Sequence, residues 1–229
     1  MTNTAIRAQD LKKTFRKVVA LDGLDLEVPE GSVYALVGVN GAGKTTTLKI
    51  LMNIFQPSAG RAEILGVEST RLSPREFEFI GYVSENQQLP DWMTVDYLLG
   101  FLKPFYAGWD SALARKLVSQ FDLPLDRTLK QLSRGMRMKV ALASSLAYRP
   151  RLIILDEPFT GLDALVRDEL IEGLLDLAEG ATVLISSHDL AEIETFASHI
   201  GYLDGGRLGF SEETASLAGR FREVEVIFD

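Results

Sequence analysis

A run of nine residues, "GVNGAGKTT" (38–46), constrains the fold of this chain more than any other part of the sequence. It lies between the apolar, strand-like "VYALV" (33–37) and the helix-like "LKILMNI" (48–54). The run fits the pattern G-x-x-x-x-G-K-[ST] in the strand, loop and helix context that this pattern requires. Glycines let such a loop curl so that backbone N–H groups point inward at phosphate oxygens, beside the positive end of the following helix. We therefore expect a phosphate-binding loop; the alternative is a glycine-rich turn with a solvated lysine.

The residues of this loop have separate expected roles. Lys44 would reach the β- and γ-phosphates of a nucleotide, and the Thr45 hydroxyl would ligate Mg²⁺. The nucleotide-binding residues expected in the loop are Gly38, Asn40, Gly41, Gly43, Lys44, Thr45 and Thr46.

Short apolar runs alternate with helical patterns along the rest of the chain. The runs "LIIL" (152–155) and "TVLIS" (182–186) are continuous, which is typical of parallel strands covered on both faces. The alternation of strand and helix predicts an α/β fold with a doubly wound parallel sheet of the phosphate-loop NTPase kind. The helical patterns lie at 45–54, 111–121, 135–148, 164–178 and 189–197.

Two parts of the chain differ from this alternation. Residues up to about 35 alternate as β-strands do, and residues 86–148 contain helical patterns without a strand signal. We expect a single domain over 1–229, in which 1–85 and 149–229 form a nucleotide-binding core with an N-terminal antiparallel β-subdomain. Residues 86–148 would form an inserted helical subdomain.

A second motif stands at the end of an apolar strand, where Asp156 and Glu157 directly follow "LIIL". Ligands bind at the carboxyl ends of the strands in sheets of this kind. Asp156 would hold Mg²⁺ through water, and Glu157 would polarise an attacking water as general base. Two carboxylates in this position could also simply cap the next helix, but the phosphate loop favours the catalytic interpretation.

These motifs and their order resemble the ATP-binding cassette subunits of ABC transporters, over nearly the whole chain. The sequence also contains "LSRGM" (132–136), similar to the family's signature, then "TGLD" (160–163) and "SSHD" (186–189). The resemblance implies an ATPase that uses ATP and Mg²⁺ and dimerises around two Mg-ATP with an identical or different cassette. It would power transport, with the exporter type favoured, through separate transmembrane subunits. The implied location is cytoplasmic, peripheral on the cytoplasmic face of the membrane.

The resemblance assigns two residues to the site of the other subunit and adds a third nucleotide-binding residue. Ser133 and the backbone of Gly135 open a helical pattern, so they would form an anion site for the γ-phosphate that the other subunit binds. Asp163 ends the "TGLD" loop and is included among the nucleotide-binding residues. The plain alternative for "LSRGM" is an ordinary helix N-cap.

Two further residues gain a role from the resemblance. His188, in "SSHD", would donate a hydrogen bond to the γ-phosphate or the attacking water, which makes it a catalytic candidate beside Glu157 and Lys44. Phe15, in "KTFRKVVAL", would stack on adenine. The alternatives are a polar strand end for His188, as we expect for His199, and a core position for Phe15.

Two places depart from the family pattern. Glu85 stands where the family commonly has a glutamine that senses Mg²⁺. A carboxylate remains an oxygen ligand, so Glu85 joins Thr45 and Asp156 as a metal candidate; alternatively it is a solvated loop acid. Arg134 and Met136 replace the more frequent glycine and glutamine of the signature. A guanidinium near a triphosphate would add charge-assisted contacts or point to solvent.

In the family, the transmembrane subunit enters a groove between the sheet and the helical lobe. We expect that groove around "LPDWMTVDYLLGFL" (89–102), where the apolar surface for the partner would come from Trp92, Met93, Val95 and Tyr97. The alternative is that these residues form the lobe's own core, and the loop-like Trp92 and Met93 favour partner contact most. The apolar residues that we expect instead in the lobe's own core are Val95, Leu98 and Leu99.

Composition weighs against other classes of protein. The 24 Lys and Arg residues against 32 Asp and Glu give a net charge of −8, so no nucleic-acid partner is expected. The absence of cysteine excludes a disulfide framework and a zinc-thiolate site. No window approaches the roughly 18 apolar residues that span a bilayer. The alternative function is a soluble ABC ATPase of translation or DNA maintenance, but a second phosphate loop and a heptad insert are both missing. The segment "FREVEVIFD" (221–229) is either a closing strand or the start of an extension.

Overall fold

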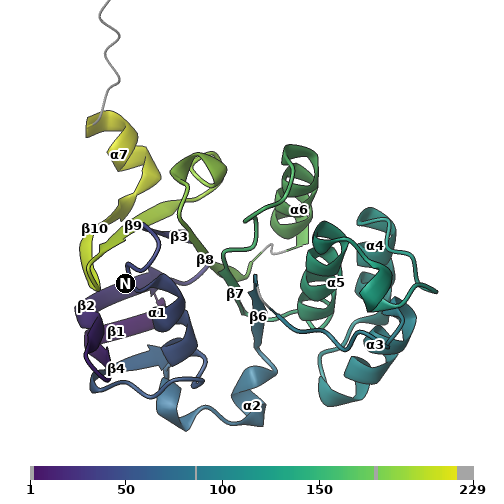
Figure 1. Ribbon diagram of the computed structural model, residues 1–229, viewed down its shortest axis with the longest axis horizontal. Helices are drawn as coiled ribbons and strands as arrows, with labels where there is room; N and C mark the ends of the chain where they lie inside the picture. The colour runs from purple at the N-terminus through teal and green to yellow at the C-terminus, as the bar shows by residue number, and fades with distance from the viewer. Residues whose placement is uncertain (1–2, 86, 178–179, 221–229) are drawn as a thin grey trace, which may run out of the picture.

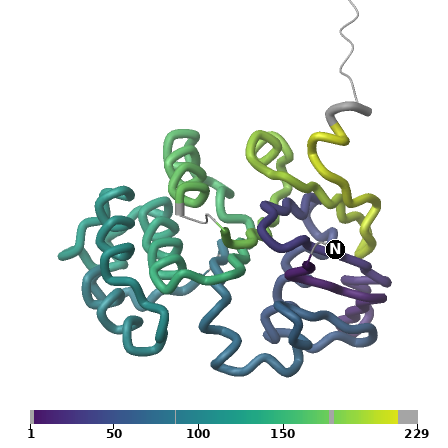
Figure 2. The backbone as a smooth tube through the Cα atoms, turned by 180° about the vertical axis from the view of Figure 1, so that it is seen from behind, coloured from purple at the N-terminus to yellow at the C-terminus, as the bar shows by residue number. Residues whose placement is uncertain are grey.

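The computed structural model describes residues 3–85, 87–177 and 180–220, so the strand-like segment at 221–229 lies outside it. Figures 1 and 2 show the molecule from opposite sides, with an antiparallel sheet at one end and a group of helices at the other. A second, mostly parallel sheet lies between them. The predicted α/β class, with N-terminal antiparallel strands and inserted helices, is confirmed.

The antiparallel sheet is built mainly from the N-terminal strands. Its order is β2-β1-β4-β5. Side chains of β1 and β2 alternate between buried and exposed positions, so one face of the sheet packs on the core. The strands are β1 (Thr4–Phe15), β2 (Val18–Pro29), β4 (Ala59–Ile64) and β5 (Val67–Glu68).

The second sheet has the order β10-β9-β3-β8-β7-β6, and only the β9–β10 pair in it is antiparallel. Every residue of β7 and β8 is buried, which agrees with their continuous apolar sequences. β3 lies between β8 and β9, so the loop that follows β3 emerges at the middle of the sheet. The strands are β3 (Val33–Val37), β6 (Ile80–Ser84), β7 (Leu152–Asp156), β8 (Thr182–Ser187), β9 (His199–Asp204) and β10 (Arg207–Glu213).

The lobe at the far end in Figure 1 contains the α-helices α3, α4 and α5 and two short 3-10 helices. Each begins at a residue whose side chain accepts a hydrogen bond from the first turn: Thr94 for α3, Asp110 for α4 and Ser133 for α5. The core positions predicted for this lobe, Val95, Leu98 and Leu99, are confirmed as buried. The helices of the lobe are α3 (Val95–Leu102), η2 (Lys103–Phe105), α4 (Ser111–Gln120), η3 (Leu129–Gln131) and α5 (Arg134–Leu146).

The remaining helices lie outside the helical lobe. None of the helices in the described part of the chain is long and apolar enough to cross a membrane. The helices between strands are α1 (Lys44–Leu51), η1 (Ser69–Arg71), α2 (Pro74–Phe77), α6 (Ala164–Leu177) and η4 (Leu190–Glu192), and α7 (Thr214–Arg220) follows β10.

The helix predicted at 189–197 was wrong. The structure has only the 3-10 turn η4 there, followed by turns that lead into β9. Asp189 accepts a hydrogen bond from Ala191 N at 3.0 Å, but the backbone leaves the helical conformation at Ile193, where φ is −129°. A nine-residue segment is too short to hold a helix by itself, so the path back to the sheet decides its conformation.

Candidate nucleotide-binding and catalytic site

The loop between β3 and α1 depends on glycine at its last position. Gly43 has a φ of 114°, which side-chain-bearing residues rarely adopt. A Cβ atom added there would lie 2.7 Å from the carbonyl oxygen of Ala20 and 2.8 Å from a methyl group of Leu21. The loop is thus held closely against β2, and α1 begins at the next residue with its N-terminus free to face an anion.

Lys44 is tied into this loop. It is 5% exposed, and its Nζ donates to the carbonyl oxygens of Gly38 at 2.5 Å and of Val39 at 3.2 Å. The same Nζ lies 3.1 Å from Oε1 of Glu157. The ammonium group is therefore pre-positioned between the loop and the second motif.

Asp156, the last residue of β7, is held by two hydroxyl groups. Its Oδ1 accepts from Thr45 Oγ1 at 3.0 Å and from Ser186 Oγ at 2.9 Å. Burial raises the pKa of Asp156 above its ordinary value, and the bonds from Ser186 and Thr45 offset part of this rise. Ser186 is at this point because the parallel register of β7 and β8 sets it opposite Asp156.

Thr45 and Asp156 form an all-oxygen pair, which is the donor type that Mg²⁺ prefers. Among the residues that the structure describes, no three His, Cys, Asp or Glu side chains are arranged to hold a metal ion by themselves. Mg²⁺ is commonly held by one or two protein ligands together with phosphates and water, so the residues present fit this ion.

Glu157 has an unusual backbone, with a φ of 51°. This left-handed conformation is uncommon for residues other than glycine, and its N–H donates to Ser186 Oγ at 3.0 Å. The carboxylate, 12% exposed, accepts from His188 Nδ1 at 2.8 Å and Thr160 Oγ1 at 3.1 Å, besides its ion pair with Lys44. Burial acts to raise the pKa of Glu157, but the bonds from His188 and Lys44 outweigh it and lower the pKa. The group is therefore a carboxylate at neutral pH.

These side chains surround one polar cavity of about 400 Å³. A smaller cavity of about 70 Å³ adjoins it at Asp156 and Lys49. The large cavity brings together most of the predicted phosphate-loop and catalytic residues. Its lining residues are Ala20, Asn40, Gly41, Gly43, Lys44, Thr45, Thr46, Glu85, Glu157, Thr160 and His188.

Phe15, the predicted adenine-stacking residue, does not line this cavity. It is the last residue of β1 and is 38% exposed. Its ring packs edge-on against Phe55 at 5.2 Å between centroids, and Lys13 Nζ lies 4.8 Å from its centroid. The ring is thus neither buried in the core nor free on both sides.

Ser133 and Gly135, predicted to face another subunit, and Asp163, predicted to bind nucleotide, also lie outside the cavity. Ser133 caps α5, and Asp163 Oδ1 accepts from the backbone N–H of Val166 at 3.0 Å. A Cβ atom at Gly135 would lie 2.8 Å from Val166 Cγ1. Gly135 therefore also lets α5 pack closely on α6, a role that the sequence did not indicate.

Comparison with known proteins identifies the family. The profile of the family described as ABC transporter matches residues 21–160, which is more than half of the chain. The chain belongs to the ABC transporter family. It is an ATP-binding cassette, an ATPase subunit, as the order of its motifs indicated.

Two relatives similar to this cassette are named as ATP-binding proteins. The daunorubicin resistance ATP-binding protein DrrA2 of Streptomyces coeruleorubidus is 39% identical, over 90% of this chain and 66% of that protein. The lantibiotic transport ATP-binding protein SrtF of Streptococcus pyogenes is 34% identical, over 91% of this chain and 90% of that protein. The cassette thus spans about two thirds of DrrA2 and most of SrtF.

Solved structures of cassettes have the same fold. An ATP-binding subunit of an ABC transporter superposes with a TM-score of 0.84 at 28% identity, covering 95% of this chain and 93% of that one. A bacterial Atm1-family ABC exporter with ATP bound gives a TM-score of 0.80 at 26% identity, covering 96% of this chain and 40% of that one.

Two residues of the cassette's site were missed by the sequence analysis. Ser186 bridges Asp156 and the N–H of Glu157, and Thr160 donates to the Glu157 carboxylate. Ser186 is a polar residue at the carboxyl end of a continuous apolar strand, which is the signal that found Asp156. Applied to "TVLIS", the same reasoning would have found Ser186.

The contact between His188 and Glu157 predicts a pH dependence of stability. The hydrogen bond to Glu157 raises the pKa of His188 above 6.5, while the pKa of Glu157 lies below 4.5. The stabilisation from His188 is present below pH 6.5 and is lost as the pH rises through its folded pKa; that from Glu157 is lost as the pH falls below 4.5. His188→Asn should therefore lower the free energy of unfolding more at about pH 6 than at about pH 9.

Urea unfolding of both proteins at the two pH values measures this difference. In a Glu157→Gln background, the effect of His188→Asn should lose its dependence on pH. An equal effect at both pH values in the wild-type background would contradict the ion pair.

Proposed function

We propose that this cassette binds Mg-ATP in the 400 Å³ cavity, hydrolyses it with Glu157 as general base, and powers export through separate transmembrane subunits. The observation that carries the proposal is the placement of the Glu157 carboxylate between Lys44 and His188. Lys44 would move from Glu157 to the phosphates of the nucleotide, and this would release the carboxylate to accept a proton from water. His188 would donate to the γ-phosphate or to that water.

Thr45 and Asp156 would hold the Mg²⁺, with Glu85 as a further oxygen ligand at the edge of the same cavity. When bound, the ion supplies positive charge that neutralises the β- and γ-phosphates. The hydroxyl bonds of Thr45 and Ser186 orient the Asp156 carboxylate for this role.

We infer that Ser133, Gly135 and Asp163 face the nucleotide of a second cassette. Ser133 and Asp163 are exposed, and Ser133 caps the 13-residue helix α5, whose N-terminus favours an anion. A two-fold pair would bury this surface over the partner's ATP and make the two sites equivalent. Phe15 would turn its ring onto adenine from its partly exposed position at the end of β1. Residues 1–85 and 149–229 would form the nucleotide-binding core, and residues 86–148 would form the helical subdomain.

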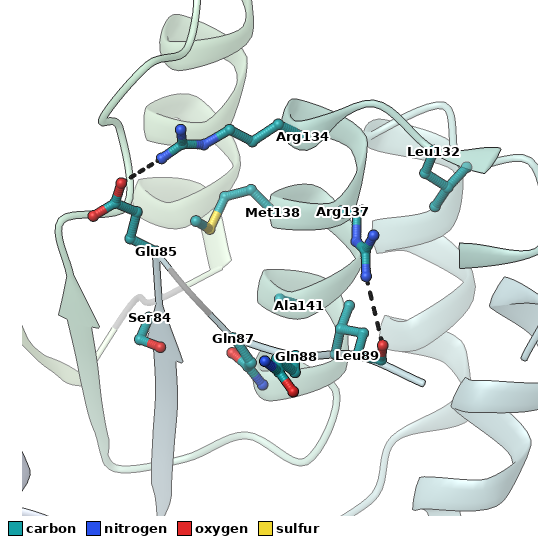
Figure 3. A pocket seen from close by; sticks show the side chains of 10 residues that line it. All are labelled: Ser84, Glu85, Gln87, Gln88, Leu89, Leu132, Arg134, Arg137, Met138 and Ala141. Carbon is teal, nitrogen blue, oxygen red and sulfur yellow. Dashed lines mark hydrogen bonds and ion pairs between the residues drawn. The ribbon is translucent and has the colours of Figure 1, made fainter. Parts of the chain in front are cut away.

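The transmembrane subunit would dock in a groove of about 530 Å³ beside α5 (Figure 3). Its lining combines apolar side chains, among them Leu89 and Met138, with amides and arginines. Of the segment 89–102, in which we expected the groove, only Leu89 lines it; Trp92 is exposed elsewhere, and Met93 is buried at 6% exposure, so the partner role predicted for Met93 was wrong. The lining residues are Ser84, Glu85, Gln87, Gln88, Leu89, Leu132, Arg134, Arg137, Met138 and Ala141.

Co-purification in mild detergent, with mass spectrometry of the bound polypeptides, tests this function. We expect a multispanning membrane protein in stoichiometric amount. Gln88→Trp, at the groove rim, should reduce it several-fold, whereas Gln120→Trp, exposed on α4, should not. Ribosomal or DNA-associated partners without a membrane protein would instead indicate the soluble alternative.

A further inference from the structure

Arg134 makes an ion pair that joins two distant parts of the chain. Its Nη2 donates to Glu85 Oε1 at 2.7 Å. Arg134 is the first residue of α5, and Glu85 directly follows β6. In Figure 3 the two side chains extend toward one another across the mouth of the groove. The pair therefore connects the helical lobe to the carboxyl end of the parallel sheet.

The guanidinium group of Arg134 also reaches a third segment. A Cβ atom at Gly161, in the "TGLD" loop, would lie 2.9 Å from Arg134 Nη1. Arg134, in the first turn of α5, thus lies next to both the end of β6 and the loop before α6. The Arg134 side chain is 48% exposed, so Glu85 and the "TGLD" loop are its contacts at the surface, and its planar guanidinium group is suited to orient a carboxylate.

Glu85 is one of three carboxylates around the nucleotide cavities. It lines the large cavity with Glu157, and the small cavity with Asp156 and Glu157. Lys44 and His188 contact the Glu157 carboxylate at ion-pair distance, and Asp156 accepts hydrogen bonds from two hydroxyl groups. The Glu85 carboxylate is met by Arg134.

We propose that Arg134 is a positioning residue for nucleotide binding. It holds the Glu85 carboxylate at the edge of the cavity and offsets a negative charge that would otherwise repel a triphosphate. The sequence departs from the family pattern at both Arg134 and Glu85. The two departures then form one feature, because the positive charge of Arg134 offsets the negative charge of Glu85. The proposal rests on the proposed function in one respect, that the cavity holds ATP.

The test is a double-mutant cycle read by equilibrium binding of Mg-ATP to the full chain. Arg134→Gln leaves an unpaired carboxylate beside the phosphates and should weaken binding about five-fold. Glu85→Gln removes that charge but keeps an amide oxygen toward the metal ion, so it should weaken binding less than Arg134→Gln does. The double variant should bind within about two-fold of Glu85→Gln, because Arg134 then has no carboxylate charge to offset, and Arg134→Lys should retain most of the affinity.

This asymmetry separates positioning from a merely structural contact, because loss of a structural contact would affect both single variants alike. The matched control is Arg149→Gln, which breaks the 2.8 Å ion pair with Asp110. The carboxylate there is 29% exposed, against 30% for Glu85. Arg149→Gln should leave ATP affinity unchanged, and thermal unfolding without nucleotide checks that all variants are folded.

The proposal is overturned if Arg134→Gln binds ATP as wild type does, if the double variant stays as weak as Arg134→Gln, or if Arg149→Gln weakens binding equally. Lys44→Ala, measured alongside, separates the two levels of inference. Weak binding by Lys44→Ala together with normal binding by Arg134→Gln would remove the role of Arg134 alone. Unchanged binding by Lys44→Ala would remove the nucleotide site itself.

Discussion

Replacing Glu157 by glutamine should nearly abolish ATP hydrolysis and leave Mg-ATP binding intact. A positioned general base accounts for about 10²- to 10⁴-fold in rate, and an amide cannot accept the proton. Glutamine has the same shape, so Thr160 and Ser186 can keep it in place. Because hydrolysis is blocked after binding, an ATP-dependent dimer should accumulate. Single-turnover hydrolysis, equilibrium binding and size-exclusion chromatography measure the three quantities.

Thr160→Val provides the comparison for Glu157→Gln. It removes the 3.1 Å hydrogen bond to the Glu157 carboxylate but leaves the carboxylate itself. A hydrogen bond to a charged group is worth about 1.5–3 kcal/mol, and His188 still contacts the carboxylate, so hydrolysis should slow by about ten-fold, at the low end of that range. Undiminished turnover by Glu157→Gln would remove Glu157 as the base.

Replacing Lys44 by alanine should weaken nucleotide binding itself. Lys44 is 5% exposed in the loop, and its charge would meet the phosphates through charge-assisted hydrogen bonds. Such bonds are worth about 1.5–3 kcal/mol each, so the affinity for ATP should fall by about 10- to 100-fold. The substitution also leaves the Glu157 carboxylate without its 3.1 Å ion pair, which adds repulsion toward the γ-phosphate.

Equilibrium binding of ATP and ADP measures the effect of Lys44→Ala. Lys130→Ala, an exposed lysine of the helical lobe, is the control for a general loss of positive charge. If Lys44→Ala binds both nucleotides with unchanged affinity, the phosphates do not lie in this loop.

The parts of the site that could be predicted from sequence are those that local pattern specifies. The phosphate loop and the pair Asp156 and Glu157 each follow a strand directly, so their position depends on a few neighbouring residues. The bonds of Ser186 and the contact between Gly135 and Val166 depend instead on pairings between residues about 30 apart. Periodicity within one segment cannot specify such pairings.

Met93 and the segment 189–197 were predicted wrongly for a related reason. Both belong to short stretches whose conformation is imposed by the elements on either side. Met93 lies just before α3, and its carbonyl oxygen accepts from Leu129 N at 2.8 Å, which turns the side chain into the lobe. The ion pair of Glu85 with Arg134 also joins residues 49 positions apart, so the sequence showed both departures without showing that they meet.

The order of the parallel sheet has a consequence for synthesis of the chain on the ribosome. β3, which carries the phosphate loop, is made early, but both of its neighbours, β8 and β9, lie between residues 182 and 204. Translation proceeds at about 5–20 residues per second, so the apolar "VYALV" strand waits on the order of ten seconds for its first partner. Its unpaired edges are exposed for that time, which is when a nascent chain is most prone to wrong pairing. A chain that stops before residue 182 would contain the complete phosphate-loop sequence but lack both strands that hold the loop in the sheet.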